Sequence, residues 1–187
     1  VYIDLDTTSV VAKSGGKRPA SAVEVAFSWH RSVLLGDPGS GKSTFVHRLC
    51  LAFANDDWEN LPAVPKASRS CLPVLLILRD FTRWLTARGA TEGDAALLRE
   101  FLVHELDRRN LTFMTPLVDR ALERKNGAMV FLDGLDEVPP EHRQIVLAAV
   151  RGFANRYPYV RLLITCRVVT YERPEWRLPG DEFPDHR

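Results

Sequence analysis

The stretch SVLLGDPGSGKSTF, residues 32–45, decides the fold of this 187-residue chain. It joins an apolar run, Ser32–Leu35, to a glycine-rich turn, a lysine and two hydroxyl side chains. The turn, Gly36–Ser43, fits the pattern G-x-x-x-x-G-K-S/T, which holds phosphate where it connects a buried strand to a helix. Its glycines let successive backbone N–H groups point at one anion, and the positive end of the next helix points to the same place. The stretch therefore predicts a strand, a phosphate-binding loop and a helix.

The residues of this loop have distinct predicted roles. Lys42 supplies a compact positive charge for the β and γ phosphates of a nucleotide, and the Ser43 hydroxyl is an oxygen ligand of the kind that Mg²⁺ prefers. Thr44 can reach an α-phosphate. We expect the whole loop to bind the nucleotide, through Gly36, Asp37, Pro38, Gly39, Ser40, Gly41, Lys42, Ser43 and Thr44.

Three further apolar runs predict strands. They are PVLLILRD (73–80), AMVFLDG (128–134) and VRLLITCR (160–167), and each contains a continuous apolar run that is followed by polar residues. Continuous apolarity is typical of strands that are covered on both faces, as in a parallel sheet. Segments with helical spacing lie between the runs, so the order of elements predicts a doubly wound α/β domain, a parallel sheet with helices on both faces.

Apolar residues at helical spacing predict four helices beside these strands. The first runs from about Gly41 to Ala54, and the last lies over 139–158, a segment bracketed by prolines. Between the first helix and the second strand, the segment 55–70, NDDWENLPAVPKASRS, is a polar excursion interrupted by prolines.

The two middle helices have recognisable ends. One should begin at the sequence TEGD, where Thr91 and Asp94 are spaced like a capping box. We expect every member of its helical stripe except Glu105 to face the core. The other should begin with Thr115 as its N-cap and end with Lys125 in its last turn.

The first 30 residues form a lead-in to a core at 31–187. VYIDLDTTSVVA (1–12) is compatible with a short strand, KSGGKRPAS (13–21) is a polar loop, and SAVEVAFSW (21–29) has helical spacing. The chain begins with Val rather than Met, so we expect it to be an excerpt of a longer multidomain protein.

All four predicted strands are followed by polar residues. These are the glycine-rich loop, the pair Arg79 and Asp80, Asp133, and Arg167. Ligands of open α/β sheets bind beyond the carboxyl ends of the strands, so we expect these ends to form one site. Arg79 and Asp80 are the exception, because a structural pair or a helix cap explains them better.

The third strand leads into a cluster of acids. A carboxylate at this place, Asp133, suits a Mg²⁺ ion that keeps part of its water shell. Asp136 and Glu137 follow one turn later, and one of them could orient or deprotonate an attacking water. An acidic first turn of the following helix would explain both equally well, since the helix dipole favours it. The sequence leaves the choice between Asp136 and Glu137 open.

The fourth strand ends in Thr165 and Arg167. A fixed cation at this edge could sense a γ-phosphate and so distinguish ATP from ADP. Pairing with a surface acid is the alternative. With this arginine, the predicted catalytic residues are Lys42, Asp133, Asp136, Glu137 and Arg167, and the predicted metal ligands are Ser43 and Asp133.

Composition narrows the class of protein. The chain is 45% apolar and 26% charged with a net charge of +1, so no nucleic-acid-binding or acidic-membrane surface is indicated. No apolar run approaches the roughly 18 residues of a membrane span, and no secretory signal opens the chain. The three cysteines form no CxxC pair, so we expect buried thiols in a cytoplasmic, reducing location. The histidines lack metal-ligand spacing, so we expect them to be surface or helix residues. The absence of an N-K-x-D motif favours ATP over GTP.

Four segments together resemble the NACHT family of signal-transducing ATPases, and its bacterial members in particular. This family belongs to the STAND class of P-loop NTPases, which are related to AAA+ proteins. The segments are GDPGSGKST (36–44), PVLLILRDF (73–81), FLDGLDEV (131–138) and LLITCR (162–167). The pattern D-G-x-D-E is the most specific, because AAA+ enzymes and helicases more often carry an acid at the position of Gly134.

The resemblance implies a three-layer α/β/α fold of the ASCE type, with strand 162–165 between the phosphate-loop strand and the Asp133 strand. It also implies ATP or ADP on the loop, Mg²⁺ at Ser43 and Asp133, and Arg167 as the first sensor. Such proteins act as switches with slow hydrolysis. ADP holds a closed monomer, and ATP opens it for self-oligomerisation in innate immunity, cell death or antiphage defence.

Two other interpretations remain at this point. A conventional P-loop enzyme, such as a small-molecule kinase, would need an acceptor pocket and a mobile lid with arginines, and the segment 58–70 is long enough for a lid. A motor ATPase acting on nucleic acid or protein is the other, but the near-neutral charge does not support it.

Overall fold

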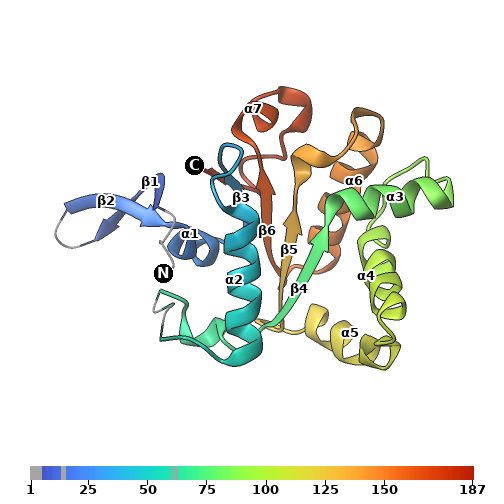
Figure 1. The fold of residues 1–187 in the computed structure, drawn as a ribbon, viewed down its shortest axis with the longest axis horizontal. Coiled ribbons are helices and arrows are strands. Elements are labelled where there is room, and N and C mark those ends of the chain that lie inside the picture. Colours follow the sequence, from blue (N-terminus) through green and yellow to red (C-terminus); the bar gives the residue numbers. More distant parts are fainter. Residues whose placement is uncertain (1–5, 14–15, 60, 62) are drawn as a thin grey trace.

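A computed structural model describes residues 6–13, 16–59, 61 and 63–187 (Figure 1). Its body is a five-stranded sheet in the order β4-β5-β6-β3-β7, in which every neighbouring pair is parallel. The strands are β3 Arg31–Leu35, β4 Leu72–Ile77, β5 Ala128–Asp133, β6 Arg161–Cys166 and β7 Asp185–His186. As the resemblance implied, β6 lies between β3 and β5.

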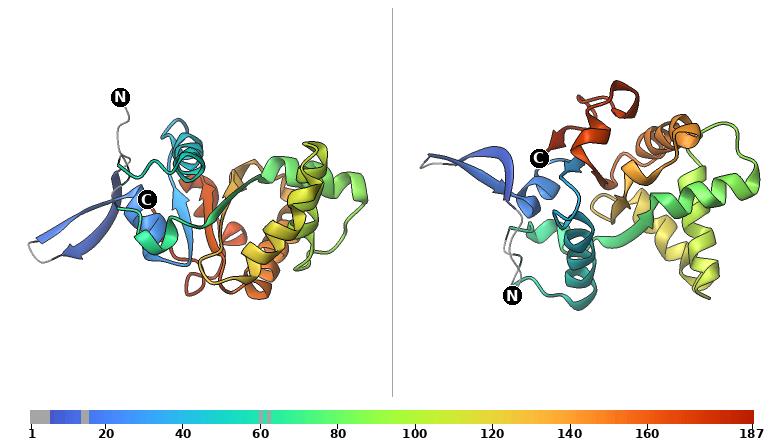
Figure 2. Two further views of the ribbon diagram at one scale, coloured as in Figure 1. Left: turned by 90° about the horizontal axis from the view of Figure 1, so that it is seen from below. Right: turned by 45° about the horizontal axis from the view of Figure 1, so that its top comes forward.

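Helices cover both faces of this sheet (Figures 1 and 2). One face packs against α1 and α2, and the other against α3 to α6. The helices are α1 Ala22–Ser28, α2 Lys42–Asn55, α3 Leu78–Arg88, α4 Leu97–Arg108, α5 Thr115–Glu123, α6 Arg143–Arg156 and the short α7 Val168–Tyr171. The predicted doubly wound, three-layer α/β/α fold is confirmed.

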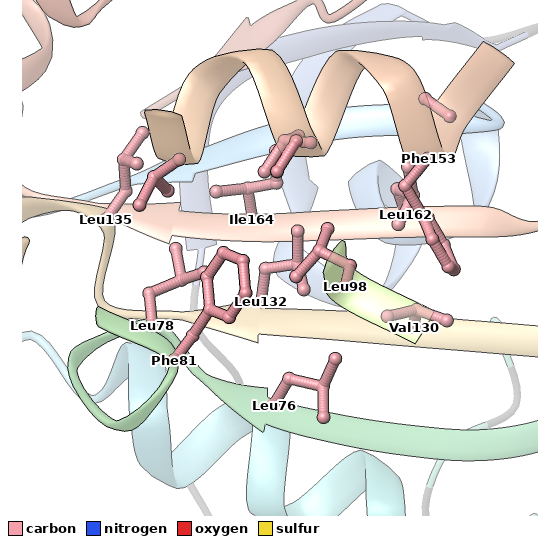
Figure 3. Close-up of a cluster of buried hydrophobic side chains, with 14 of the residues drawn as sticks. Leu76, Leu78, Phe81, Leu98, Val130, Leu132, Leu135, Phe153, Leu162 and Ile164 are labelled. Carbon is pink, nitrogen blue, oxygen red and sulfur yellow. The ribbon is translucent and has the colours of Figure 1, made fainter. Parts of the chain in front are cut away.

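The central strands explain why apolar runs are continuous. All six residues of β5 are buried, and successive side chains point to opposite faces. Val130 and Leu132 join the cluster beneath α3 to α6, where they meet Leu162 and Ile164 of β6 (Figure 3). Phe131 faces the cluster under α1 and α2. Both faces of β5 are therefore covered by protein.

Helix α3 was not predicted, and it changes the place of two site candidates. Strand β4 ends at Ile77, and α3 begins at the next residue with no intervening turn. Buried Leu78, Phe81 and Leu85 then follow helical spacing. Arg79 and Asp80 therefore lie in the first turn of α3 and not at a strand end.

The predicted ends of the middle helices were wrong in detail. Helix α4 begins at Leu97, without a capping box. Asp94 Oδ1 accepts from the N–H groups of Ala96 at 2.6 Å and Leu97 at 3.1 Å, so Thr91 has no capping role. Helix α5 has Met114 and not Thr115 as its N-cap and ends at Glu123, because a 3-10 turn (η2, Thr112–Met114) leads directly into it.

Glu105 is also placed differently from the prediction. Its side chain is only 12% exposed, so it faces inward with the apolar stripe of α4. Arg108 and Arg109 each lie 2.8 Å from its carboxylate. A buried carboxylate is tolerated when it is paired, and two guanidinium groups supply that pairing here.

The amino-terminal segment forms a hairpin that extends away from the sheet (Figure 2). Strand β1 Asp6–Lys13 pairs antiparallel with β2 Gly16–Ser21. The loop predicted over 13–21 is therefore wrong at 16–21, because backbone pairing does not require an apolar pattern. The strand predicted over 1–12 is confirmed from residue 6, and its first five residues lie outside the described ones.

Ser21 begins α1 with a capping box. Its hydroxyl accepts from the N–H of Glu24 at 3.3 Å, and the Glu24 carboxylate accepts from the N–H of Ser21 at 3.1 Å.

Strand β7 is a fifth strand of the sheet that was too short to predict, and it follows the fully buried Phe183. No helix in the described part of the chain combines the length and apolarity needed to cross a membrane.

Candidate functional site

The phosphate-binding loop has the curled backbone that its sequence predicts. Gly39 and Gly41 have φ angles of 77° and 87°, a region that favours glycine. The N–H of Ser40 donates to the carbonyl of Asp37 at 3.1 Å and closes a turn. Gly41 is the N-cap of α2 and provides no side-chain cap. The first N–H groups of α2 are therefore directed at whatever lies beyond the loop.

Lys42 is folded back over this loop. Its Nζ donates to the carbonyl oxygens of Gly36 at 2.7 Å and Asp37 at 3.0 Å, and to Ser40 Oγ at 3.2 Å. Gly36, Asp37 and Ser40 thus position the ammonium group. A phosphate that approached the loop would exchange with these neutral acceptors, which are weaker partners for an ammonium ion than a phosphate oxygen is.

Asp133 is held at the end of β5 by the neighbouring strand. The Thr165 hydroxyl donates to Asp133 Oδ1 at 2.5 Å and accepts from the N–H of Gly134 at 2.9 Å. Gly134 has a φ of 83°, which lets the chain turn sharply out of the sheet. Thr165 was noted at its strand end without a role, and only the pairing of β5 with β6 places it against Asp133.

Asp136 holds the arginine at the end of β6. Its Oδ2 lies 2.8 Å from Arg167 Nε, and its Oδ1 accepts from the backbone N–H of Arg167 at 3.1 Å. The Asp136 side chain is 8% exposed, whereas that of Arg167 is 51% exposed. Both carboxylate oxygens of Asp136 therefore contact Arg167. The arginine has an acidic partner, and this partner belongs to the site and not to an unrelated surface.

Glu137 has a different arginine partner. Its Oε2 lies 3.3 Å from Arg79 Nη1, and both side chains are about half exposed. The predicted pair of Arg79 with Asp80 is longer, at 4.0 Å. Asp80 instead lies 2.9 Å from Arg83. The sequence did not reveal the link between Arg79 and Glu137, because it connects the first turn of α3 with the turn after β5, which is distant in the chain.

These residues line one cleft of about 290 Å³ at the carboxyl edge of the sheet. All five predicted catalytic residues lie there, together with both predicted metal ligands. The lining consists of Pro38, Gly39, Gly41, Lys42, Ser43, Thr44, Asp133, Gly134, Asp136, Glu137, Thr165 and Arg167. Three of the predicted loop residues, Gly36, Asp37 and Ser40, are not part of this lining.

The donor set fits a nucleotide-bound Mg²⁺ ion. Ser43 offers one hydroxyl oxygen and Asp133 one carboxylate in the same cleft. Among the described residues, no three His, Cys, Asp or Glu side chains are grouped closely enough to hold a metal. Mg²⁺ typically takes one or two protein oxygens and fills its other positions with water and phosphate oxygens, so a larger cluster is not needed.

The cysteine next to Arg167 is an unreactive thiol. Cys166 is fully buried at the end of β6, and burial together with the nearby charge of Asp136 raises the pKa of its thiol to about 12. It therefore remains a neutral thiol at physiological pH and packs as a small apolar side chain.

The fold and this cleft define a nucleotide-binding P-loop NTPase domain. The family model described as the NACHT domain matches residues 30–178, which is well over half of the chain. The chain therefore belongs to the NACHT family. Among curated proteins, none matches this chain.

Proposed function

We propose that this NACHT domain is an ATP/ADP switch that hydrolyses ATP slowly with Mg²⁺ and controls self-oligomerisation of a larger cytoplasmic protein. In this proposal residues 31–187 form the switch and residues 1–30 lead into it. Signalling in innate immunity, including antiphage defence, is the output that suits such a module.

The pair of Arg167 and Asp136 carries the proposal. Arg167 is half exposed at the cleft, and its only acidic partner among the described residues is Asp136. ATP brings a γ-phosphate to this edge and ADP does not. Arg167 can therefore exchange its carboxylate partner for a phosphate partner only when ATP is bound. An element with two alternative partners has the two states that a switch needs.

The same contacts support roles for the other residues of the cleft. Lys42 and the loop Gly36–Thr44 hold the phosphates, while Ser43 and Asp133 hold the Mg²⁺ ion, which neutralises phosphate charge when bound. Asp136 has both oxygens engaged with Arg167, so we assign it to positioning that arginine. Glu137 is 42% exposed at the cleft, and we assign it to orienting the attacking water.

A small-molecule kinase is less well supported. The segment 58–70, which was the candidate lid, packs into the core through buried Trp58, Leu61 and Val64. The guanidinium of Arg69 lies 5.5 Å from the Trp58 ring centroid and its Nε donates to the Val64 carbonyl. This segment is therefore anchored under α2 and does not provide mobile arginines above the cleft.

Calorimetry with ADP and a non-hydrolysable ATP analogue tests the switch. In Arg167→Ala, ADP affinity should stay within about twofold of the wild type, while analogue affinity should fall about tenfold, because one charge-assisted contact to the γ-phosphate is lost. Lys42→Ala should lose both nucleotides. Equal losses of ADP and analogue affinity in Arg167→Ala would contradict the sensor role, and unchanged ADP affinity in Lys42→Ala would contradict the phosphate site.

A further inference from the structure

Among the described residues, no strand pairs with the outer edge of β4. Strand β4 pairs with β5 on one side and is the last strand of the order (Figure 1). The N–H of Leu72 donates to Gly127 at 2.8 Å, so by alternation the hydrogen-bonding groups of Leu75 point to the outer edge. Pro73 has no N–H to offer there, but its carbonyl faces the same way. The edge therefore presents the N–H groups of Leu75 and Ile77 and the carbonyls of Pro73 and Leu75.

Two cavities follow this edge and make it the floor of a groove. One, of about 550 Å³, contacts the start of β4 at Leu72 and Pro73, and the other, of about 320 Å³, contacts its end at Leu75 and Ile77. Both lie between helix α2 on one side and helices α4 and α5 on the other. We call this feature the β4 groove.

The wall formed by α2 is largely apolar. His47 and Ala54 line the two cavities, and Leu51 lies between them on the same helical face. Leu51 is 57% exposed, which is unusual for a large apolar side chain in a helix. Phe53 adds an aromatic ring at the lower end. A side chain directed at this wall would be apolar.

At the larger cavity the opposite wall is positively charged, whereas the smaller cavity is lined by Asp80, Glu105 and Arg109. Leu117, Arg120 and Arg124 repeat along the exposed face of α5 and line the larger cavity. Arg69, which packs on Trp58 on the α2 side, adds a third guanidinium to this cavity, and no carboxylate lines it. Within the described part of the chain, neither Arg120 nor Arg124 has a carboxylate within ion-pair distance, in contrast to the paired arginines of the nucleotide cleft. A side chain directed at this wall would be acidic.

We propose that the β4 groove binds an extended peptide as a sixth strand of the sheet, with apolar side chains toward α2 and acidic side chains toward Arg120 and Arg124. Successive side chains of a strand point to opposite faces, so alternate residues of the peptide would meet the apolar wall and the arginine wall. The free edge of β4 supplies the backbone hydrogen bonds, and the walls supply the sequence preference. This site is separate from the nucleotide cleft and does not depend on its function.

Labelled hexapeptides with blocked ends test the proposal on the wild-type chain. A peptide of alternating valine and glutamate should bind in fluorescence anisotropy, and the matching valine–lysine peptide should bind at least about tenfold more weakly, since it brings like charges to the arginines. Hydrogen-exchange mass spectrometry should show protection of residues 72–77 by the glutamate peptide. Equal binding of both peptides, or binding without that protection, would overturn the proposal.

A charge-reversal variant tests whether the wall formed by Arg120 and Arg124 binds the peptide. The double variant Arg120→Glu/Arg124→Glu should lose at least about tenfold in affinity for the glutamate peptide. The matched control, Arg151→Glu/Arg173→Glu, changes two exposed arginines elsewhere and should stay within about twofold. Lys42→Ala should also bind the peptide normally, which excludes the nucleotide cleft as its site. Loss of binding in the control or in Lys42→Ala would refute the location.

A proline substitution tests the backbone hydrogen bonds at the free edge of β4. Leu75→Pro removes the central N–H of the free edge and should weaken the peptide at least about fivefold, with circular dichroism confirming the fold. If this variant does not fold, the same contact is tested in the wild-type chain by whether the glutamate peptide protects the Leu75 amide from exchange. Protection of residues 72–77 that rises with protein concentration alone would assign the groove to a second copy of the chain and refute the peptide.

Discussion

Strands β4 and β5 look alike in the sequence and differ in the structure. They pair in register from Leu72 with Ala128 to Ile77 with Asp133, and both are almost entirely apolar. Every residue of β5 is buried, whereas only Leu76 of β4 is. Their carboxyl ends differ too, because β5 ends in the cleft carboxylate and β4 turns at once into α3. Apolarity alone therefore marks a strand without telling whether it is central or at an edge.

The largest difference should appear when a leucine is shortened in each strand. Leu132→Ala removes a fully buried side chain and should lower the free energy of unfolding by about 2–5 kcal/mol. Leu75→Ala removes a half-buried one and should cost about 1–2 kcal/mol. Urea unfolding with equal m-values measures both. Equal losses would mean that β4 is covered in solution and is not a free edge.

The carboxyl ends of the strands can be compared through their acids. Asp133→Asn should lower Mg²⁺-dependent ATP affinity about 10- to 100-fold, or about 1.4–2.7 kcal/mol, because it removes the negative charge beside the metal position. Asp80→Asn, in the first turn of α3 after β4, should leave that affinity unchanged. Calorimetry with and without Mg²⁺ distinguishes the two, and a similar loss in both variants would contradict the assigned metal site.

The contact that anchors the end of β5 should have a smaller effect. Thr165→Val keeps the shape but leaves the Gly134 N–H and Asp133 without their hydroxyl partner, which should cost about 1–2 kcal/mol of stability. Thr165→Ser retains the hydroxyl and should restore most of it. Thermal unfolding measures both variants. If Thr165→Val and Thr165→Ser are equally stable, the hydroxyl contacts do not stabilise this strand end.

The smallest effect is expected for the ion pair between Arg79, in the first turn of α3, and Glu137, in the turn after β5. Arg79 and Glu137 are 54% and 42% exposed, so a double-mutant cycle with Arg79→Ala and Glu137→Ala should give a coupling below about 1 kcal/mol. About 1 M NaCl should abolish it, because exposed charges are screened. A larger, salt-independent coupling would show that the pair is shielded from solvent.

The cleft was predictable where its chemistry is local in sequence. The loop Gly36–Thr44 needs its glycines, lysine and hydroxyls within a few positions, and the acids from Asp133 to Glu137 are equally close together. Helix α3 was missed because Leu78 continues the apolar run of β4 with no turn signal between strand and helix. Glu105 was placed outward because its burial depends on two arginines further along the same helix.

The partners of the site residues could not be predicted in the same way. Thr165 contacts Asp133, and Arg167 contacts Asp136, across 32 and 31 positions of the chain. Each contact exists because β5 and β6 are neighbours in the sheet. The family resemblance implied that neighbour relation but not which side chains meet across it. The sequence showed which side chains follow each strand, but not which of them form hydrogen bonds or ion pairs with one another.

The sequence by itself determined the phosphate loop, the buried strands and the class of fold, because these follow from residue types at short spacing. Only the tertiary structure decided that Asp136 holds Arg167, that Arg79 reaches Glu137, and that β4 presents a free edge beside Arg120 and Arg124. The physical reason is that ion pairs and edges belong to neighbouring elements. Their energies depend on which strands meet, and that is settled when the sheet assembles.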